Sequence, residues 1–246
     1  MLSFKLFSHY QELLYGLSEI ADGAMNAGGG ETKEYARAQA NRHQHFANLG
    51  FTPSAVVSAV LSHGTQIHEG KPADGGIYLQ DADGIVTSAR DLLLTVTTAD
   101  CFPVYLYDPG KQAVGLLHAG WRGTASGIIH NALQAMQDKF GSTPSDILVA
   151  IGPGIQACHY EVHDDVLGRF AKYPAACIVR DGKTYLDLPR VLAAHAQSSG
   201  IRPKNIEVSF LCTYEERTRY FSARRNPDAP LETMVAYVAV KKRENS

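Results

Sequence analysis

The sequence predicts an α/β fold in which a mixed β-sheet is flanked by helices. Apolar, β-branched runs alternate with helical stretches, as in β–α units. Other apolar runs follow one another through short turns, as in antiparallel hairpins, so a purely parallel doubly wound sheet is not expected. The 246 residues also contain no internal repeat, low-complexity tail or linker. We therefore expect one domain with a substantial core.

The individual elements follow from these patterns. Residues 1–30 carry no clear signal, and 26–31 (NAGGGE) has the composition of a loop. Strands are expected at 55–61, 92–98, 102–107, 113–117, 146–151, 206–211, 219–223 and 233–240, and 81–88 is expected to form a turn and a short strand. Helices are expected at 31–49, ended by Gly50, at 124–140, with Thr124 as N-cap and Gly141 as its stop, and at 161–172 and 187–198.

Composition excludes several classes of partner. Hydrophobic residues make up 45% of the chain and charged residues 20%, as in globular proteins. The formal net charge of -2, with no basic block, disfavours nucleic acids and anionic membranes. No signal peptide or transmembrane stretch is visible. The cysteines are scattered without a C-x-x-C pair, so we expect a reduced, cytoplasmic protein; they are Cys101, Cys158, Cys177 and Cys212.

The hairpin of residues 101–118 carries the first chemical signal. If its turn is centred between Pro109 and Gly110, Asp108 faces Lys111 and Cys101 faces His118. Directly opposed residues on antiparallel strands have Cβ atoms about 5 Å apart. A bulge at Pro103, which lacks a ladder donor, would shift this pairing by one position. Register therefore predicts that a thiol and an imidazole meet at one end of the sheet.

His63 is a candidate third ligand, because it follows the strand 55–61 and precedes a glycine. Two histidines and a cysteine suit Zn²⁺, and three protein ligands leave the fourth position open for catalysis. The alternatives are a metal-free nucleophile–base pair of Cys101 and His118, and ordinary structural roles for all three residues.

Positive groups surround this candidate site in the sequence. Arg122 lies in HAGWRG (118–123), and a helix beginning after Gly123 would add backbone N–H donors for an anion. Tyr160 and Glu161, which follow a Gly-Pro-Gly turn, are further candidates to bind the substrate or phosphate, and Arg224-Arg225 suits phosphate or carboxylate groups. The alternative for each of these residues is an ordinary structural role, as a turn residue, as a charge at a helix N-terminus or as part of a solvated edge.

Four motifs in this order resemble the YfiH family, which has been described both as laccase-like polyphenol oxidases and as purine nucleoside phosphorylases. They are TADCFPVYLYDP (98–109), HAGWRG (118–123), IGPGIQACHYEV (151–162) and CTY followed by YFSARR (212–225). The resemblance runs from about residue 55 to the C-terminus, and residues 1–54 diverge. It implies a single three-layer α/β/α domain with a mixed sheet, similar to the cysteine-hydrolase-like fold.

The resemblance also implies a metal site of His63, Cys101 and His118. The family's glutamine before the first histidine is absent here, where the sequence is Leu61-Ser62-His63-Gly64, and His68 is the competing candidate. In the N-terminal part, 18–20 (SEI) lacks the arginine of the corresponding family stretch.

The activity implied by the resemblance is phosphorolysis of adenosine, inosine, guanosine and methylthioadenosine, together with deamination of adenosine. In this scheme Zn²⁺ activates a water, and Asp100 or Glu161 carries the proton. Arg122, the helix start after Gly123 and Arg224 hold phosphate. The alternatives are a copper-dependent polyphenol oxidase, a metal-free Cys101 hydrolase of amide bonds such as those in cell-wall peptides, and a non-enzymatic binding protein. No pattern in the sequence specifies an oligomeric state.

Overall fold

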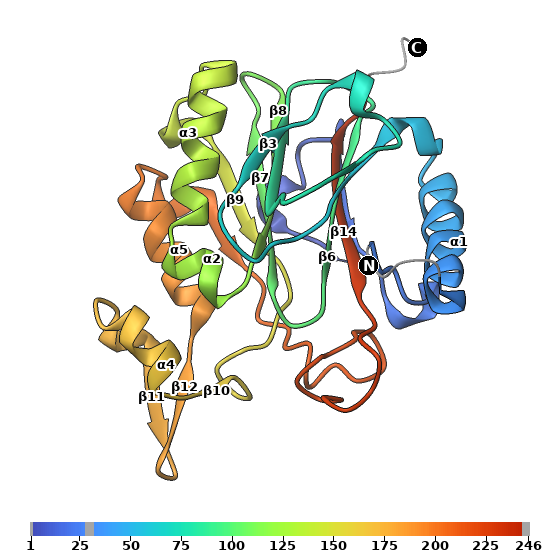
Figure 1. The fold of residues 1–246 in the computed structure, drawn as a ribbon. Helices are drawn as coiled ribbons and strands as arrows, with labels where there is room; N and C mark the ends of the chain where they lie inside the picture. Colours follow the sequence, from blue (N-terminus) through green and yellow to red (C-terminus); the bar gives the residue numbers. More distant parts are fainter. Residues whose placement is uncertain (1, 28–31, 243–246) are drawn as a thin grey trace.

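Two mixed β-sheets pack face to face between helices (Figure 1). The computed structural model describes residues 2–27 and 32–242. The loop expected at 26–31 lies largely outside these residues. The helices are α1 (Lys33–Asn48), α2 (Trp121–Ala125), α3 (Ile128–Phe140), α4 (Asp164–Leu167) and α5 (Leu188–Ser198).

The first sheet has five strands in the order β1-β14-β6-β2-β4. Their bounds are β1 (Leu13–Leu17), β14 (Met234–Val240), β6 (Leu93–Thr98), β2 (Val56–Ala59) and β4 (Tyr78–Leu79). β14 is antiparallel to β1 and β6, whereas β2 runs parallel to β6 and β4. The first and last described strands of the chain therefore lie side by side.

The second sheet has six strands in the order β13-β9-β7-β8-β5-β3. Their bounds are β13 (Ile206–Val208), β9 (Leu148–Ile151), β7 (Phe102–Asp108), β8 (Ala113–Ala119), β5 (Gly84–Thr87) and β3 (Ile67–Glu69). Adjacent strands among the four central ones are antiparallel, whereas each edge strand is parallel to its neighbour. β6 and β7 are consecutive in the chain, so residues 99–101 cross from one sheet to the other.

Three apolar layers hold these parts together. α3 and α5 cover the outer face of the second sheet, and α1 covers the outer face of the first (Figure 1). Between the sheets lies a fully buried layer that includes Leu94, Tyr105, Leu116 and Ala236. The mixed α/β class and the mixed sheets are confirmed, and the structure divides the expected sheet layer into two sheets packed against each other.

A smaller three-stranded sheet extends from this body (Figure 1). It consists of β10 (Glu161–Val162), β12 (Lys183–Leu186) and β11 (Cys177–Arg180). The helix expected at 161–172 is therefore wrong at its start, because the first two residues pair with β12, and the helix proper is the short α4.

The helix expected at 124–140 is divided in two. Gly127 has φ 82°, a left-handed conformation that interrupts the helix between α2 and α3. The predicted N-cap role of Thr124 is wrong, since its hydroxyl donates to the carbonyl of Gly120, one turn back inside α2. The predicted stop at Gly141 is confirmed, with φ 66° at the end of α3.

The other expected elements differ mainly in length. The helix 31–49 is observed as α1, with Thr32 capping the amide of Tyr35 and Gly50 following its last turn at φ 81°. Residues 219–223, expected as a strand, form turns instead, because the amides of Arg219 and Tyr220 bond back to Glu216. Among the described residues, no helix is both long enough and apolar enough to cross a membrane.

Candidate metal and substrate site

The hairpin of β7 and β8 has a different register from the one expected. Pro103 lies opposite His118, and Asp108 lies opposite Ala113. The reason is a four-residue loop: the Asp108 carboxylate accepts the amides of Gly110 and Lys111, which widens the turn by two residues. The expected pairing of Cys101 with His118 is thus wrong, and the two residues are diagonal neighbours.

The three predicted ligands nevertheless come together. One side-chain nitrogen each of His63 and His118 and the sulfur of Cys101 all lie within 4.8 Å of one another. Diagonal neighbours on one face of an antiparallel pair remain within reach of long side chains. His63 enters from the loop between β2 and β3, and its ring centroid lies 4.9 Å from that of His118. His68, the competing candidate, is on β3 and is outside this cluster.

His118 has the properties expected of a metal ligand. Its residue is only 4% exposed, yet neither ring nitrogen has a hydrogen-bond partner among the described residues. Burial, followed by the nearby His63, lowers the pKa of His118 to about 3, so its imidazole is neutral. Buried polar atoms without partners are costly and rare, and neutral imidazole is the form that binds metals. A metal ion bound to one of these two nitrogens would therefore supply a missing partner.

The environment of Cys101 also indicates a cation site. Burial, reinforced by the neighbouring Asp100, raises the pKa of the Cys101 thiol to about 12, and Arg122 opposes this only in part. A proton transfer from this thiol to the His118 imidazole is strongly uphill, which disfavours a metal-free nucleophile–base pair. A divalent cation between them would stabilise both the thiolate and the neutral imidazole.

Asp83 connects the two histidine-bearing segments, and sequence reasoning did not single it out. Its buried carboxylate accepts the amide and the hydroxyl of Ser62, at 3.1 and 2.8 Å. Its carbonyl accepts the His118 amide at 2.8 Å. Asp83 thus places the residue before His63 against the strand that carries His118. The available signal was a charged residue directly before the apolar run of β5.

The two glycines of HAGWRG make room for the ligands. A Cβ atom on Gly120 would lie 2.9 Å from the Cys101 sulfur, and one on Gly123 would lie 2.6 Å from the Gly64 carbonyl oxygen. Gly123 therefore allows the His63 loop to approach α2. The helix begins at Trp121 instead of after Gly123, with Gly120 as its N-cap. The anion site predicted at a helix start after Gly123 is wrong in that detail.

We expect Gly123→Ala to weaken the binding of added zinc to the three candidate ligands by about tenfold or more, because the new methyl group must push the loop of His63 away. Overpacking of this kind should also lower the free energy of unfolding by about 1–3 kcal/mol. Zinc competition titrations and chemical denaturation measure the two effects. Gly168→Ala is the matched control, since its Cβ would meet nothing within 4 Å. Wild-type zinc affinity in Gly123→Ala would show that the loop is not positioned by this contact.

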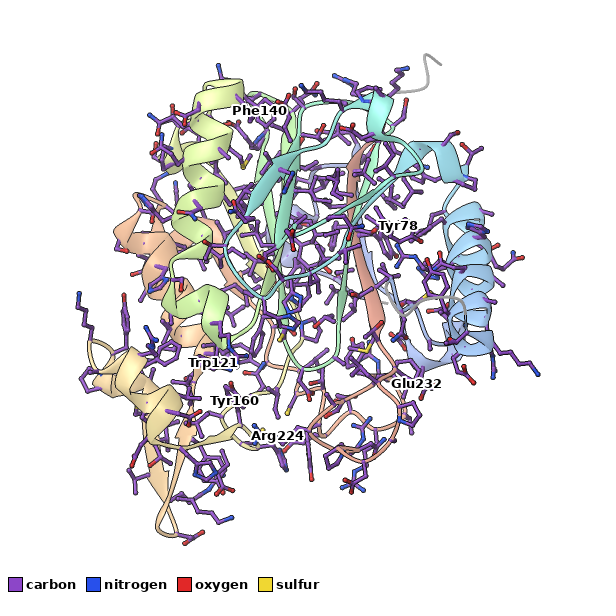
Figure 2. The ribbon with its side chains drawn as sticks, in the orientation of Figure 1. Tyr78, Trp121, Phe140, Tyr160, Arg224 and Glu232 are labelled. Carbon is purple, nitrogen blue, oxygen red and sulfur yellow. The ribbon has the colours of Figure 1, made fainter. Side chains whose placement is uncertain are left out.

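Aromatic and cationic side chains lie beside the cluster. Trp121, Tyr160 and Arg224 gather below the ends of the central strands (Figure 2). The Arg122 guanidinium lies 4.4 Å from the Trp121 ring centroid, and that of Arg224 lies 5.4 Å from the Tyr160 ring centroid. The charge of Arg122 acts on both Cys101 and Tyr160, so the predicted cation lies near the predicted metal ligands.

Asp100 anchors the last of the four motifs to the site. Its backbone has φ 86°, and its buried carboxylate accepts the hydroxyls of Thr213 and Ser222 at 2.7 and 3.0 Å. It also accepts the Arg224 amide at 2.7 Å. Because Cys101 directly follows Asp100, these contacts fix the position of Arg224 relative to Cys101. They are the structural basis for the proximity of segments more than a hundred residues apart.

The carboxylate of Glu161 is turned to a different partner. It accepts from Lys183 of β12 at 2.9 Å, which lowers the pKa of Glu161. The contact between Glu161 and Arg224 uses the Glu161 carbonyl, at 2.9 Å. Arg225 donates to the carbonyls of Thr213 and Tyr220 and so shapes its own loop.

Comparison with known sequences gives one description for the family and another for its relatives. The family model described as multi-copper polyphenol oxidoreductase laccase matches residues 11–241. The purine nucleoside phosphorylase YlmD of Bacillus subtilis is 34% identical over 183 residues, which cover 72% of this chain and 66% of that protein, slightly less than two thirds. The purine nucleoside phosphorylase YlmD of Geobacillus stearothermophilus is 35% identical over 199 residues, covering 76% of this chain and 73% of that protein.

A solved structure shares the fold over nearly the whole chain. The crystal structure of the hypothetical protein YfiH of Bacillus licheniformis superposes with a TM-score of 0.87 at 30% identity, covering 94% of each chain. The match of the family model includes most of the N-terminal part, which the motifs do not reach. The chain therefore belongs to the family described as multi-copper polyphenol oxidoreductase laccase, which is the YfiH family that its four motifs resemble.

Proposed function

We propose that this chain is a zinc-dependent purine nucleoside phosphorylase that also deaminates adenosine. The observation that carries the proposal is the cluster of His63, Cys101 and His118, with both nitrogens of the buried His118 lacking partners. Three such ligands suit Zn²⁺ with one position open to substrate or water. The names of the relatives support phosphorolysis as the main reaction.

Phosphorolysis requires phosphate beside the ribose. A phosphate oxygen forms a bond to C1′ while the bond from C1′ to the purine nitrogen breaks, and the base leaves with the electron pair and takes up a proton. Positive charge develops on the sugar, and the phosphate must be held close to it. Arg122 and Arg224, whose charges both act on Tyr160, are the groups we assign to phosphate. The Tyr160 hydroxyl is an uncharged donor close to both arginines, and we assign it to the sugar.

Deamination replaces the amino group at C6 of adenosine with a water oxygen and releases ammonia. A zinc ion at this site would supply a Lewis acid and lower the pKa of a bound water towards about 7. Of the two candidate proton carriers, Asp100 directly precedes Cys101 and its charge raises the pKa of the Cys101 thiol, whereas Glu161 is paired with Lys183. We therefore assign the role of proton carrier in deamination to Asp100.

The alternative activities have less support. Copper is the alternative metal, and a copper-dependent polyphenol oxidase is the alternative that the family description favours. Multicopper chemistry needs histidine-rich sets of ligands, and the groups of potential metal ligands among the described residues contain at most two histidines each. His43 and His45 form an H-x-H pair, but they lie on α1, which packs on the sheet away from His118. A metal-free hydrolase needs an easily ionised thiol, and burial raises the pKa of Cys101.

Incubation with adenosine tests the proposal directly. With phosphate present, we expect adenine and ribose 1-phosphate, and adenine formation should stop when phosphate is omitted. Inosine formed without phosphate would report the deaminase activity. Tight binding of adenosine with no turnover would favour a binding protein, and oxidation of phenols with added copper would favour the oxidase. Either of these last results, with no adenine formed, would overturn the proposal.

A further inference from the structure

A second group of metal-binding side chains lies outside the candidate active site. The ligand atoms of Cys158, His159 and Cys212 all lie within 4.8 Å of one another, and the group shares no residue with the first cluster. The Cys212 sulfur is 4.0 Å from Nδ1 of His159. Cysteine and histidine at this separation are the ligands that structural zinc sites use.

The backbone already holds the two contributing segments together. Gly154 and Cys212 form a parallel bridge, and the Thr213 amide donates to the Gly154 carbonyl at 3.1 Å. The Gln156 amide lies 3.4 Å from the Cys212 sulfur, and its side chain donates to the carbonyl of Leu211 at 3.3 Å. Residues separated by more than fifty positions therefore meet in a fixed arrangement, as a preformed metal site requires.

A carboxylate lies beside two of the three side chains, and an aromatic ring orients the imidazole. The Glu215 carboxylate oxygen is 3.5 Å from Nδ1 of His159 and also lies beside Cys158. The His159 ring stacks on Tyr214, with centroids 4.3 Å apart and an interplanar angle of 18°. Cys212 is 2% exposed, whereas Cys158 and His159 are partly exposed and leave a path for an ion.

We propose that Cys158, His159 and Cys212 bind a second zinc ion, with Glu215 completing a closed, four-coordinate site. Binding would release the protons of the two thiols and join the segment before Tyr160 to the segment after β13. Because Tyr160 directly follows His159 and contacts Arg224, this ion would hold one wall of the substrate site without taking part in the reaction. The proposal does not depend on the activity assigned above.

The test isolates the second site by removing a ligand of the first. Full-length Cys101→Ser, purified with reductant, is loaded with zinc and desalted, and bound zinc is measured by elemental analysis. We expect one zinc per chain, and none in Cys101→Ser/Cys158→Ser. Cobalt loading should give thiolate-to-cobalt charge-transfer absorption in the first variant and not in the second.

The controls separate loss of a ligand from loss of fold. Cys101→Ser/Cys177→Ser should keep its zinc, since Cys177 is a partly buried cysteine outside both clusters. Circular dichroism checks folding, and Cys101→Ser/His159→Asn replaces the Cys158 variant if the latter is unfolded. The proposal is overturned if Cys101→Ser binds no zinc, or if the zinc persists without Cys158 and without His159. A disulfide between Cys158 and Cys212 in protein prepared with reductant would also overturn it.

Discussion

Cys101→Ser is expected to lose zinc at the first site and to lower kcat/KM for adenosine phosphorolysis by about 100-fold or more. A serine hydroxyl stays protonated and binds zinc far more weakly than a thiolate. Without the ion, His118 keeps two buried nitrogens with no protein partner, and its depressed pKa prevents it from gaining a proton at neutral pH. The effect should therefore appear as a lost metal and a lost rate together.

Cys177→Ser is the matched control for this prediction, because it removes a partly buried thiol that belongs to neither cluster. Zinc content per chain, initial rates with adenosine and phosphate, and circular dichroism should be measured on both variants. A Cys101→Ser protein that keeps its first zinc and loses activity would make Cys101 a nucleophile. A Cys101→Ser protein that keeps both its first zinc and its activity would exclude Cys101 from the site.

Asp100→Asn is expected to lower the free energy of unfolding by about 2–4 kcal/mol. It should also reduce kcat/KM for adenosine phosphorolysis by about tenfold or more. The carboxylate accepts three hydrogen bonds, from Thr213, Ser222 and the Arg224 amide. An amide side chain would present an NH₂ group to donors, which leaves buried groups unpaired. Arg224 would then lose the contact that places it near Cys101.

Asp181→Asn is the control for the effect of an Asp-to-Asn substitution at a residue with positive φ. Asp181 also has a positive φ, 51°, but lies exposed in the turn between β11 and β12. Asparagine tolerates this conformation, so the control should be close to wild type in chemical denaturation and in rate. Equal stability of Asp100→Asn and wild type would show that the three hydrogen bonds do not hold the loop.

Much of the site could be predicted from sequence, although one step of the reasoning was wrong. Cys101 and His118 were expected to face each other, and they meet instead as diagonal neighbours because the Asp108 carboxylate sets a four-residue loop. Both registers place the two side chains on the same face at the same end of the hairpin. The two side chains stay close because the register shifts by two residues, and a shift by an even number keeps them on the same face of the sheet.

The parts that could not be predicted depend on long-range pairing. β1 pairs with β14, more than two hundred residues away, and no local pattern in the first 30 residues announces it. β4 and β10 are two residues long and exist because a neighbouring strand pairs with them. The division into two sheets follows from these pairings. Asp83, which carries hydrogen bonds to both histidine segments, looks like a turn residue until the fold is known.

Anomalous X-ray scattering at the zinc absorption edge tests the central claim most directly. A crystal of the full chain purified without chelator should show an anomalous peak about 2.0–2.1 Å from one nitrogen each of His63 and His118 and about 2.3 Å from the Cys101 sulfur. A peak there would establish the open three-ligand site on which the proposed chemistry depends. Zinc-loaded crystals with no anomalous density between these three residues would contradict it, whether or not zinc is found at Cys158 and Cys212.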